Sequence, residues 1–525
     1  MTSSLSKTKN TSTAPDGTVY AIPSESAQKI HFDKLAQKAA WHRTQGRQIV
    51  VVQGLGFVGS AVAAVIAAAT DEAGQPLYFV IGVDLPSPSG YWKVGKLNDG
   101  LAPIVSPDPE LPQLIHEAVY KTQNLEATVS EEVYTLADVI VVDIHLDVLN
   151  RLAQTAAEIK INLDSFGAAI HTVGRYMRPD ALILIETTVP AGTSEKFVLP
   201  ILREERALRG IDQPPLLAHA YERVMPGPKY INSIRHFWRT FSGIDQTSTA
   251  KARDFLSSFI DTTAYPLWEL QDTNSSELAK LLENSYRATN IAFIHEWTLL
   301  AENMGINLFT VVDSIRVRQG THDNMRFPGF GVGGYCLTKD SLLAQWSAIN
   351  LANQELLLGM TLEALKINHR MPLHTLDLLK ELFEGELAGK TIAVCGVAYL
   401  PEVADTRNSP TEIFVDELLK TGAVVIVHDP YVTTWVERPN IPVTQDLAGC
   451  LRQADGIVLA IPHRPYRDLL PQMICQASLA LSSPVLVDAQ NIITDEKAEL
   501  LHDAGCRLLG VGKGHWRTRG YQCLK

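Results

Sequence analysis

The sequence predicts an α/β protein with two Rossmann-like, doubly wound domains joined by a long central helical segment. In both halves of the chain, short runs rich in Val, Ile and Leu alternate with helical stretches. Each half opens with such a run, which leads directly into a glycine turn. Between the halves, residues 274–304 form one continuous helical pattern. Strands separated by helices are typical of a parallel sheet that carries helices on both faces.

Residues 1–45 come before the first strand and begin with a stretch rich in Ser and Thr. We expect a polar N-terminal arm that ends in a helical lead-in and has no assigned chemistry. The start of the chain lacks the apolar core of a signal peptide, and no run reaches the roughly 18 apolar residues of a membrane span. A cytoplasmic location is therefore expected.

Residues 46–245 are expected to form the first Rossmann-like domain. Runs of four to eight residues rich in Val, Ile and Leu between turn signals are typical of strands buried on both faces. The predicted strands lie in RQIVVVQ, LYFVIGVD, ADVIVVDI and DALILIET.

Residues 246–372 form the predicted central segment. Its long helix starts at Asn274 with Glu277 three residues on, the spacing of a capping box, and closes at Gly305. At about 1.5 Å per residue such a helix reaches roughly 45 Å, longer than most helices within one domain. We expect it to link domains and to offer a dimer face. Residues 373–525 then form the second Rossmann-like domain, with strands in KTIAVCGVAY, AVVIVHDP, GIVLAIP and PVLVDA.

The charge and the cysteines exclude several classes of function. The chain has 46 basic and 58 acidic residues, a net charge of -12. An extended basic surface for nucleic acid or an anionic membrane is therefore not expected. The six cysteines are scattered without a CxxC pair or zinc-ligand spacing. We expect reduced thiols and no metal site.

The first predicted strand leads into a GxGxxG turn, formed by Gly54, Gly56 and Gly59 with Phe57 and Val58 between them, and then into an Ala-rich helix. In this context the glycines allow a tight turn and close approach of a dinucleotide pyrophosphate to the helix N-terminus. Asp84 ends the next strand, where a carboxylate binds the ribose hydroxyls of NAD and repels a 2′-phosphate. NAD is therefore the predicted cofactor. The alternative is a glycine turn that serves packing.

Several motifs together resemble the UDP-glucose/GDP-mannose dehydrogenase family over nearly all of residues 47–515. These motifs are GLGFVG, KLNDGLAPI, ETTVPAGTSE, YERVMPG, ELAKLLENSYRATNIAFIHE, GFGVGGYCLTKD, GVAYLPEVADTRNSP and VHDPY. The resemblance implies an NAD domain, a central dimerisation segment and a C-terminal domain that helps to hold the nucleotide. It also implies oxidation of the sugar's primary alcohol to a uronic acid with two NAD, and a homodimer or larger homo-oligomer that serves polysaccharide or glycoconjugate synthesis.

Cys336 is the candidate nucleophile. A thiolate adds to an aldehyde to give a thiohemiacetal, and loss of a second hydride converts it to a thioester. The surrounding glycines, Gly333 among them, would let substrate approach the sulfur, and Lys339 would help to form the thiolate and is a candidate cofactor contact. Without this frame, Cys336 would be interpreted as a small buried hydrophobic residue.

The resemblance also implies further catalytic groups. Lys280 and Asn284 lie four apart on one face of the long helix and would stabilise developing oxyanions. Glu222 and Asp340 would activate water for thioester hydrolysis, and Thr188 would bond this network and the cofactor. The alternatives are a solvated helix face for the first pair and a structural role for Thr188.

Three arginines complete the candidate site. Arg407 matches a position that reaches the cofactor, with an ion pair to Asp405 as the alternative. Arg223, beside Glu222, and Arg326 are candidate substrate contacts; for Arg326 the alternative is solvent exposure. Lys280, Asn284, Glu222 and Gly333 are also candidate substrate contacts.

The chain departs from the family at three places. Leu400 stands where a lysine usually contacts the nucleotide-sugar, residues 144–147 replace a Pro-rich turn, and Leu337-Thr338 stands where a proline is common. His145 in the second of these is a candidate substrate contact or a structural residue. The sugar and nucleotide are therefore left open. Two other hypotheses are a two-electron alcohol dehydrogenase of related fold and a non-catalytic binding protein.

Overall fold

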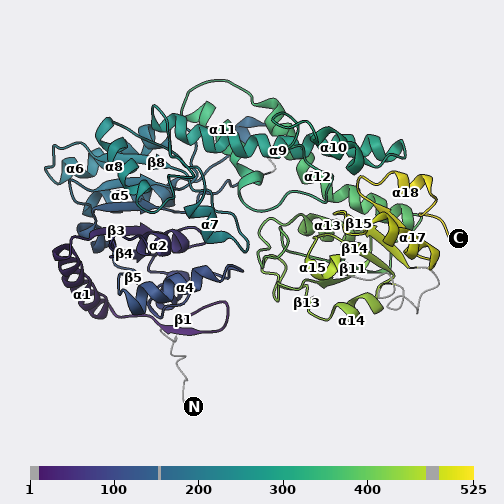
Figure 1. Ribbon diagram of the computed structural model, residues 1–525, viewed down its shortest axis with the longest axis horizontal. Coiled ribbons are helices and arrows are strands. Elements are labelled where there is room, and N and C mark those ends of the chain that lie inside the picture. The colour runs from purple at the N-terminus through teal and green to yellow at the C-terminus, as the bar shows by residue number, and fades with distance from the viewer. Residues whose placement is uncertain (1–10, 152–154, 469–473, 475–483, 525) are drawn as a thin grey trace, which may run out of the picture. The chain divides into compact units, whose positions relative to one another are not determined.

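The computed structural model describes residues 11–151, 155–468, 474 and 484–524. These residues form two compact units. The first unit holds residues up to 150, 155–281 and 343–356, and the second holds residue 151, 282–342 and the chain from 357 onward. Each unit contains one parallel or mainly parallel sheet with helices on both faces, as Figure 1 shows. The prediction of two doubly wound domains with a long central helix is thus confirmed.

The first unit has an eight-stranded sheet in the order β10-β9-β8-β7-β6-β3-β4-β5. All neighbours are parallel except β8 and β9. The strands are β3 Gln48–Gln53, β4 Tyr78–Val83, β5 Leu125–Thr128, β6 Val139–Val142, β7 Leu182–Ile185, β8 Leu216–Ala220, β9 Thr240–Gly243 and β10 Trp268–Glu269.

The helices of the first unit cover both faces of this sheet. Alternate residues of β3 pack into the hydrophobic cores on the two opposite faces of the sheet, because successive side chains of a strand point to opposite faces. Val50 and Val52 pack with α2 and α8, whereas Ile49 and Val51 pack with α1, α5 and α6. The helices are α1 Glu25–Thr44, α2 Gly59–Ala67, α3 Pro88–Asn98, α4 Glu110–His116, α5 Asp164–Tyr176, α6 Leu199–Leu208, α7 Tyr230–Arg235 and α8 Gln246–Ser257.

The second unit has a six-stranded parallel sheet in the order β13-β12-β11-β14-β15-β16. Ile392 and Val394 pack with α12 and α13, and Ala393 and Cys395 pack on the other face with α14 and α17. The elements are α10 Leu308–Arg316, α11 Cys336–Asn350, α12 Gly359–Leu382, β11 Thr391–Cys395, α13 Pro410–Lys420, β12 Val424–His428, β13 Val443–Thr444, α14 Leu447–Arg452, β14 Gly456–Leu459, α15 Arg464–Arg467, β15 Val485–Asp488, α17 Asp495–Asp503, β16 Arg507–Gly510 and α18 His515–Thr518. Helix α11 continues into the first unit.

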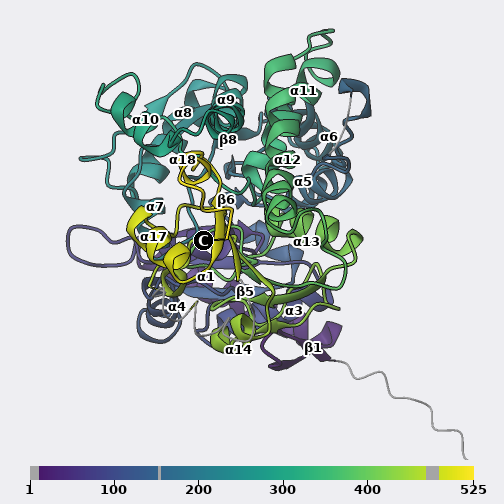
Figure 2. The ribbon, with the colours of Figure 1, turned by 90° about the vertical axis from the view of Figure 1, so that its right-hand side faces the viewer.

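The segment before β3 is more ordered than a polar arm. A hairpin of β1 Thr11–Thr13 and β2 Val19–Ala21 lies beside α3, as Figure 2 shows for β1, and Ser12 donates to the backbone oxygen of Pro88. Helix α1 buries Leu35 and Ala39 completely. These two residues are four apart and therefore share the helix face that packs on the sheet. Residues 1–10 lie outside the described residues.

The long helix is α9, Thr273–Asn303. The predicted capping box is wrong: Asp272, and not Asn274, caps the helix, since its Oδ1 accepts from the Ser275 backbone N–H at 2.8 Å. Glu277 instead accepts from the N–H groups of Gly192 and Ser194, in a turn distant in sequence. The predicted end is confirmed, because Gly305 has a φ of 70°, the conformation that closes many helices.

Candidate active site

The glycine turn follows β3 at the carboxyl edge of the first unit's sheet. Gly54 has a φ of 98°, and a Cβ on Gly59 would lie 1.9 Å from the oxygen of Gly54, so neither position tolerates a side chain. A Cβ on Gly56 would meet no atom within 4 Å, which leaves open space beside the turn. Phe57 packs against Tyr230, and Val58 directly precedes α2. The turn therefore offers the N-terminus of α2 to an anionic ligand.

Asp84 directly follows β4 and faces this turn. Its Oδ2 accepts from the Leu55 N–H and from Lys93 Nζ, both at 3.1 Å, and its Oδ1 accepts from the Leu85 N–H. Lys93, in the second turn of α3, was not among the predicted site residues. The signal was available in the sequence, because a lysine in the helix after a ribose-binding Asp lies within reach of it.

A network of buried charges lies at the same edge of the first sheet. Lys280 donates to the backbone oxygen of Glu222 at 3.0 Å and lies 3.6 Å from Glu222 Oε1. Glu186, which directly follows β7, forms an almost completely buried ion pair with Arg239. The first pair joins two predicted site residues, and the second joins two residues that the prediction did not include. Glu186 lies in the ETTVP motif, which could have singled it out.

The two threonines that follow Glu186 differ in their contacts and burial. Thr187 Oγ1 accepts from the Ile144 N–H at 2.9 Å and donates to the oxygen of Val142, so it ties the ends of β6 and β7 together. Thr188, the predicted catalytic residue, is half-buried. Arg223 stacks its guanidinium on the rings of Tyr221 and Phe237.

In the second unit, Cys336 is the first residue of α11 and is exposed. Asp340, one turn on, is completely buried and accepts from Asn284 Nδ2 at 2.7 Å and from Lys339 Nζ at 2.9 Å. The Lys339 charge is thus balanced by Asp340. The structure therefore brings four predicted residues of the second unit onto α11 and its contact with α9.

The ring and Cβ of Tyr399 occupy the space in which side chains at the two glycines before Cys336 would lie. A Cβ on Gly333 would lie 2.6 Å from the Cβ of Tyr399, and one on Gly334 would lie 2.7 Å from the Tyr399 ring. Packing, and not substrate approach alone, therefore accounts for these glycines. Thr338, at a position where proline is common, donates to the oxygens of Gly334 and Tyr335 and closes the turn.

Arg407 forms a bidentate ion pair with Asp405, and its guanidinium lies 4.6 Å from the ring centre of Tyr335. Burial alone would lower the pKa of Arg407, but the bonds to Asp405 raise it above its ordinary value. Arg407 thus forms the ion pair with Asp405, and its contact with the cofactor stays a prediction. Arg151, which was not predicted, stacks on the same tyrosine and donates to Thr338 Oγ1 at 2.9 Å.

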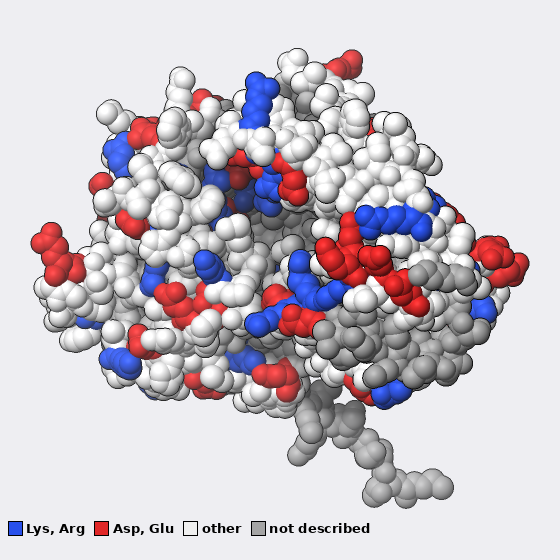
Figure 3. Space-filling model, turned by 45° about the vertical axis from the view of Figure 1, so that its right-hand side comes forward, with Lys and Arg blue, Asp and Glu red and all other residues white. Residues whose placement is uncertain are grey.

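Arg326 lies among other arginines. Burial, and then the charges of Arg287 and Arg316, lower the pKa of Arg326. Such a group of like charges favours an anionic ligand. In the face shown in Figure 3, by contrast, basic and acidic side chains are interspersed and form no continuous basic field.

Three sequence comparisons with family models cover most of the chain. Residues 48–256 match the NAD binding domain, 274–370 the central domain and 393–495 the UDP binding domain of the UDP-glucose/GDP-mannose dehydrogenase family. The chain belongs to this family. It is thus a member of a nucleotide-sugar dehydrogenase family and an NAD-dependent oxidoreductase.

Individual relatives agree with the family models. The UDP-N-acetyl-D-mannosamine dehydrogenase of Pyrococcus horikoshii is 29% identical over 472 residues, 89% of this chain and 99% of the relative. The NDP-N-acetyl-D-galactosaminuronic acid dehydrogenase of Methanosarcina mazei Go1 has a solved structure with a TM-score of 0.75 and 30% identity, covering 92% of this chain and 98% of that one. The solved UDP-D-ManNAc dehydrogenase of P. horikoshii also has a TM-score of 0.75, at 28% identity.

NAD, the cofactor of this dehydrogenase family, fits the turn between β3 and α2. The open space at Gly56 admits a pyrophosphate beside the helix N-terminus. Asp84 lies at the end of β4, where a carboxylate would accept hydrogen bonds from the hydroxyls of the adenosine ribose. Among the departures from the family, the segment 144–147 begins beside the glycine turn, because Ile144 N would lie 3.8 Å from a Cβ on Gly54. Leu400 is partly exposed, and His145 lies 3.7 Å from Asp147 with both side chains about half exposed.

We expect Asp84→Asn to reduce the preference of this dehydrogenase for NAD over NADP by about tenfold or more. The carboxylate repels a 2′-phosphate, and its removal leaves the Lys93 ammonium facing the same place. Titration of the full chain with each cofactor would measure the ratio of dissociation constants. Lys93→Gln is the control and should not improve NADP binding; an unchanged ratio in Asp84→Asn would contradict this reading.

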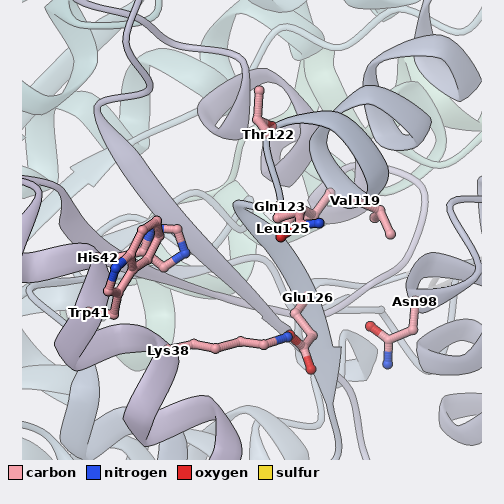
Figure 4. A pocket seen from close by; sticks show the side chains of 9 residues that line it. All are labelled: Lys38, Trp41, His42, Asn98, Val119, Thr122, Gln123, Leu125 and Glu126. Carbon is pink, nitrogen blue, oxygen red and sulfur yellow. The ribbon is translucent and has the colours of Figure 1, made fainter.

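A separate hollow of about 450 Å³ lies in the first unit, and none of the predicted site residues lines it. Figure 4 shows its lining from α1, α3, η1 (Glu117–Lys121), the turn after η1 and β5: Lys38, Trp41, His42, Asn98, Val119, Thr122, Gln123, Leu125 and Glu126. Among the described residues no group of acidic, His and Cys side chains has the arrangement of a metal site. None of the described helices has the length and apolarity to cross a bilayer.

Proposed function

We propose that the chain oxidises the primary alcohol of a nucleotide-sugar to a carboxylate in two hydride transfers, with Cys336 holding the intermediate. The observation that carries this proposal is the exposed thiol at the start of α11, one turn from the buried Asn284–Asp340–Lys339 network. A simple two-electron alcohol oxidation needs no such nucleophile.

The proposed reaction consists of two oxidations and one hydrolysis. The alcohol loses a hydride and a proton to become an aldehyde, and the Cys336 sulfur bonds to the aldehyde carbon to give a thiohemiacetal. Loss of a second hydride and a proton gives the thioester. Water then adds to the thioester carbon, the carbon–sulfur bond breaks, and the carboxylate and the thiol are released. NAD, when bound, accepts the hydride in each oxidation.

The network residues have distinct proposed roles. Lys280 and Asn284 stabilise the oxygen that gains negative charge, since both are hydrogen-bond donors held by buried partners. Glu222 and Asp340 accept protons, Asp340 for the hydrolytic water, and Thr188 positions the reacting oxygen. Arg223, Arg326 and the Gly333 backbone are proposed substrate contacts, with Lys339 and Arg407 toward the cofactor.

The substrate we propose is a UDP-linked 2-acetamido hexose. Residues 393–495 match a UDP binding domain, which supports the nucleotide. Several relatives are named as dehydrogenases of N-acetylated mannosamine or galactosamine derivatives, which supports the sugar. The arginines around Arg326 favour an anion such as a diphosphate. Service in polysaccharide synthesis and a cytoplasmic location stay predictions.

The test is NADH formation by the purified chain with UDP-, GDP-, CDP- and TDP-sugars, counted per sugar consumed. Two NADH per UDP-N-acetylhexosamine are expected. One NADH per sugar would favour the two-electron alternative. NAD binding without turnover on any sugar would favour a binding protein.

We also propose that the chain forms a homodimer through α9. In the second unit, α9 exposes a row of large apolar side chains at spacings of three, four and seven residues, which places them on one face. These residues are Leu282, Tyr286, Phe293, Trp297, Leu300 and Met304. A contiguous apolar face of this kind marks an interaction surface, and a second copy supplies a matching one through a two-fold axis.

Trp297→Glu is therefore expected to weaken the dimer by about 2 kcal/mol or more, roughly thirtyfold in dissociation constant. The substitution places a carboxylate in a face that pairing would desolvate. Light scattering after size-exclusion chromatography would measure the mass at a series of concentrations. Leu500→Glu, at an exposed apolar residue of α17, is the matched control and should leave the dimer intact. A monomeric wild type would contradict the proposal.

A further inference from the structure

Asp143 directly follows β6 and packs across the glycine turn. Its N–H donates to the oxygen of Gln53, the last residue of β3, at 2.9 Å. A Cβ on Gly54 would lie 2.3 Å from the backbone oxygen of Asp143, and one on Gly59 would lie 3.2 Å from its Oδ2. The Asp143 carboxyl is therefore seated beside the start of α2, where the turn receives a pyrophosphate.

The Asp143 carboxyl has an unmatched oxygen. Oδ2 is out of contact with solvent and has no hydrogen-bond partner among the described residues. Buried polar atoms of this kind nearly always have a partner in a native protein. An ionised carboxyl would leave this buried oxygen with neither a donor nor solvent, so the geometry favours the neutral acid.

The charges around Asp143 disfavour its ionised form. Val142 and Ile185 are paired in register, which places Asp143 beside Glu186 at the ends of neighbouring strands. Glu186 is paired with Arg239, and Glu222 with Lys280, so each cation already has a carboxylate. The nearby turn residues 54–59 and Gln53 carry no titratable group. A third carboxylate would be uncompensated here.

The direction of the pKa shift of Asp143 agrees with these pairings. Burial, followed by the charges of Glu186 and Glu222, raises the pKa of the Asp143 carboxyl well above its ordinary value, against a smaller opposite effect of Arg239. On its own loop, His145 and Asp147 are about half exposed and paired with each other. In the part of the chain that the structure describes, the cations near Asp143, Arg239 and Lys280, are each paired with another carboxylate.

We propose that Asp143 stays protonated and donates a hydrogen bond to an oxygen of bound NAD, so that the cofactor binds only the neutral form of this side chain. An ionised Asp143 would repel the anionic pyrophosphate, whereas a carboxylic acid supplies a donor. The inference depends on NAD binding and not on the proposed sugar or on Cys336.

The test is titration calorimetry of the full chain with NAD, without sugar, from pH 6 to pH 9.5. At pH 6, Asp143→Asn should bind NAD within about threefold of wild type, because an amide also donates, while Asp143→Ala should bind about tenfold more weakly. As the pH rises through the raised pKa of Asp143, wild type should lose NAD affinity relative to Asp143→Asn, which does not titrate. Asp147→Asn, on the same loop, should follow wild type at every pH.

A second measurement needs no cofactor. Above the ordinary pKa of 3.8, the unfolded chain releases the Asp143 proton that the folded chain keeps. Folding therefore takes up a proton, and the melting temperature of wild type should fall relative to Asp143→Asn as the pH rises from 5 to 8.

Parallel melting curves over this range would overturn the proposal, because they would show an ionised carboxyl in the folded chain. Tenfold weaker NAD binding by Asp143→Asn at pH 6 would also overturn it, as would wild-type affinity in Asp143→Ala. Because these readouts are binding and stability, failure of the nucleotide-sugar assay leaves them unaffected.

Discussion

Replacement of Cys336 by alanine is expected to lower the turnover of nucleotide-sugar to carboxylate by more than about 10³-fold. The thiol is needed only after the first hydride transfer, because an aldehyde cannot give a thioester without it. The variant should therefore stop at the aldehyde and form at most one NADH per sugar. Hydroxylamine would trap the aldehyde as an oxime, which mass spectrometry would detect.

Cys523→Ala is the matched control, because Cys523 is also an exposed cysteine of the second unit. It should retain two NADH per sugar and wild-type turnover. Two NADH per sugar in Cys336→Ala would refute the covalent route and leave the family's fold and cofactor untouched. Wild type that also stops at one NADH would point to the two-electron alternative.

The largest expected effect on stability comes from Arg239→Met, at about 3–5 kcal/mol of unfolding free energy. The Arg239 and Glu186 side chains are almost completely buried, so the substitution leaves a carboxylate in the core without its cation. Burial already raises the pKa of Glu186, and Arg239 opposes that shift. Without Arg239, Glu186 should take up a proton on folding, so the destabilisation should grow as the pH rises.

Urea unfolding of three variants would measure this. Arg253→Met breaks the ion pair with Glu269, in which both side chains are nearly half exposed, and should cost less than about 1 kcal/mol. The double variant Glu186→Gln with Arg239→Met should recover a large part of the loss if the uncompensated charge is its cause. No recovery would show that lost packing dominates instead.

Local features of this chain could be predicted from its sequence because their causes are local. The glycine turn at residues 54–59, the Asp at the end of β4 and the close of α9 at Gly305 each depend on neighbouring residues and backbone conformation. The strand and helix pattern follows from the spacing of apolar residues, which sets the faces that each element can bury. The resemblance added Cys336, Lys280, Asn284 and Asp340, which no local rule would single out.

Partners distant in sequence were decided by the tertiary structure. Asn284 bonds Asp340 across 56 positions, and Lys280 bonds Glu222 across 58. Glu277 has the spacing of a helix cap, yet it binds a turn near Gly192, because Asp272 already caps α9.

The sequence by itself determined the fold class, the NAD turn and the residues able to do the chemistry, because periodicity and turn chemistry are properties of neighbouring residues. Only the tertiary structure decided which charged groups pair: Arg407 with Asp405, and Glu186 with Arg239. It also left Asp143 Oδ2 without a hydrogen-bond partner among the described residues. Such pairings depend on sheet register and on the packing of segments far apart in the chain, and a side chain's charge state depends in turn on those pairings.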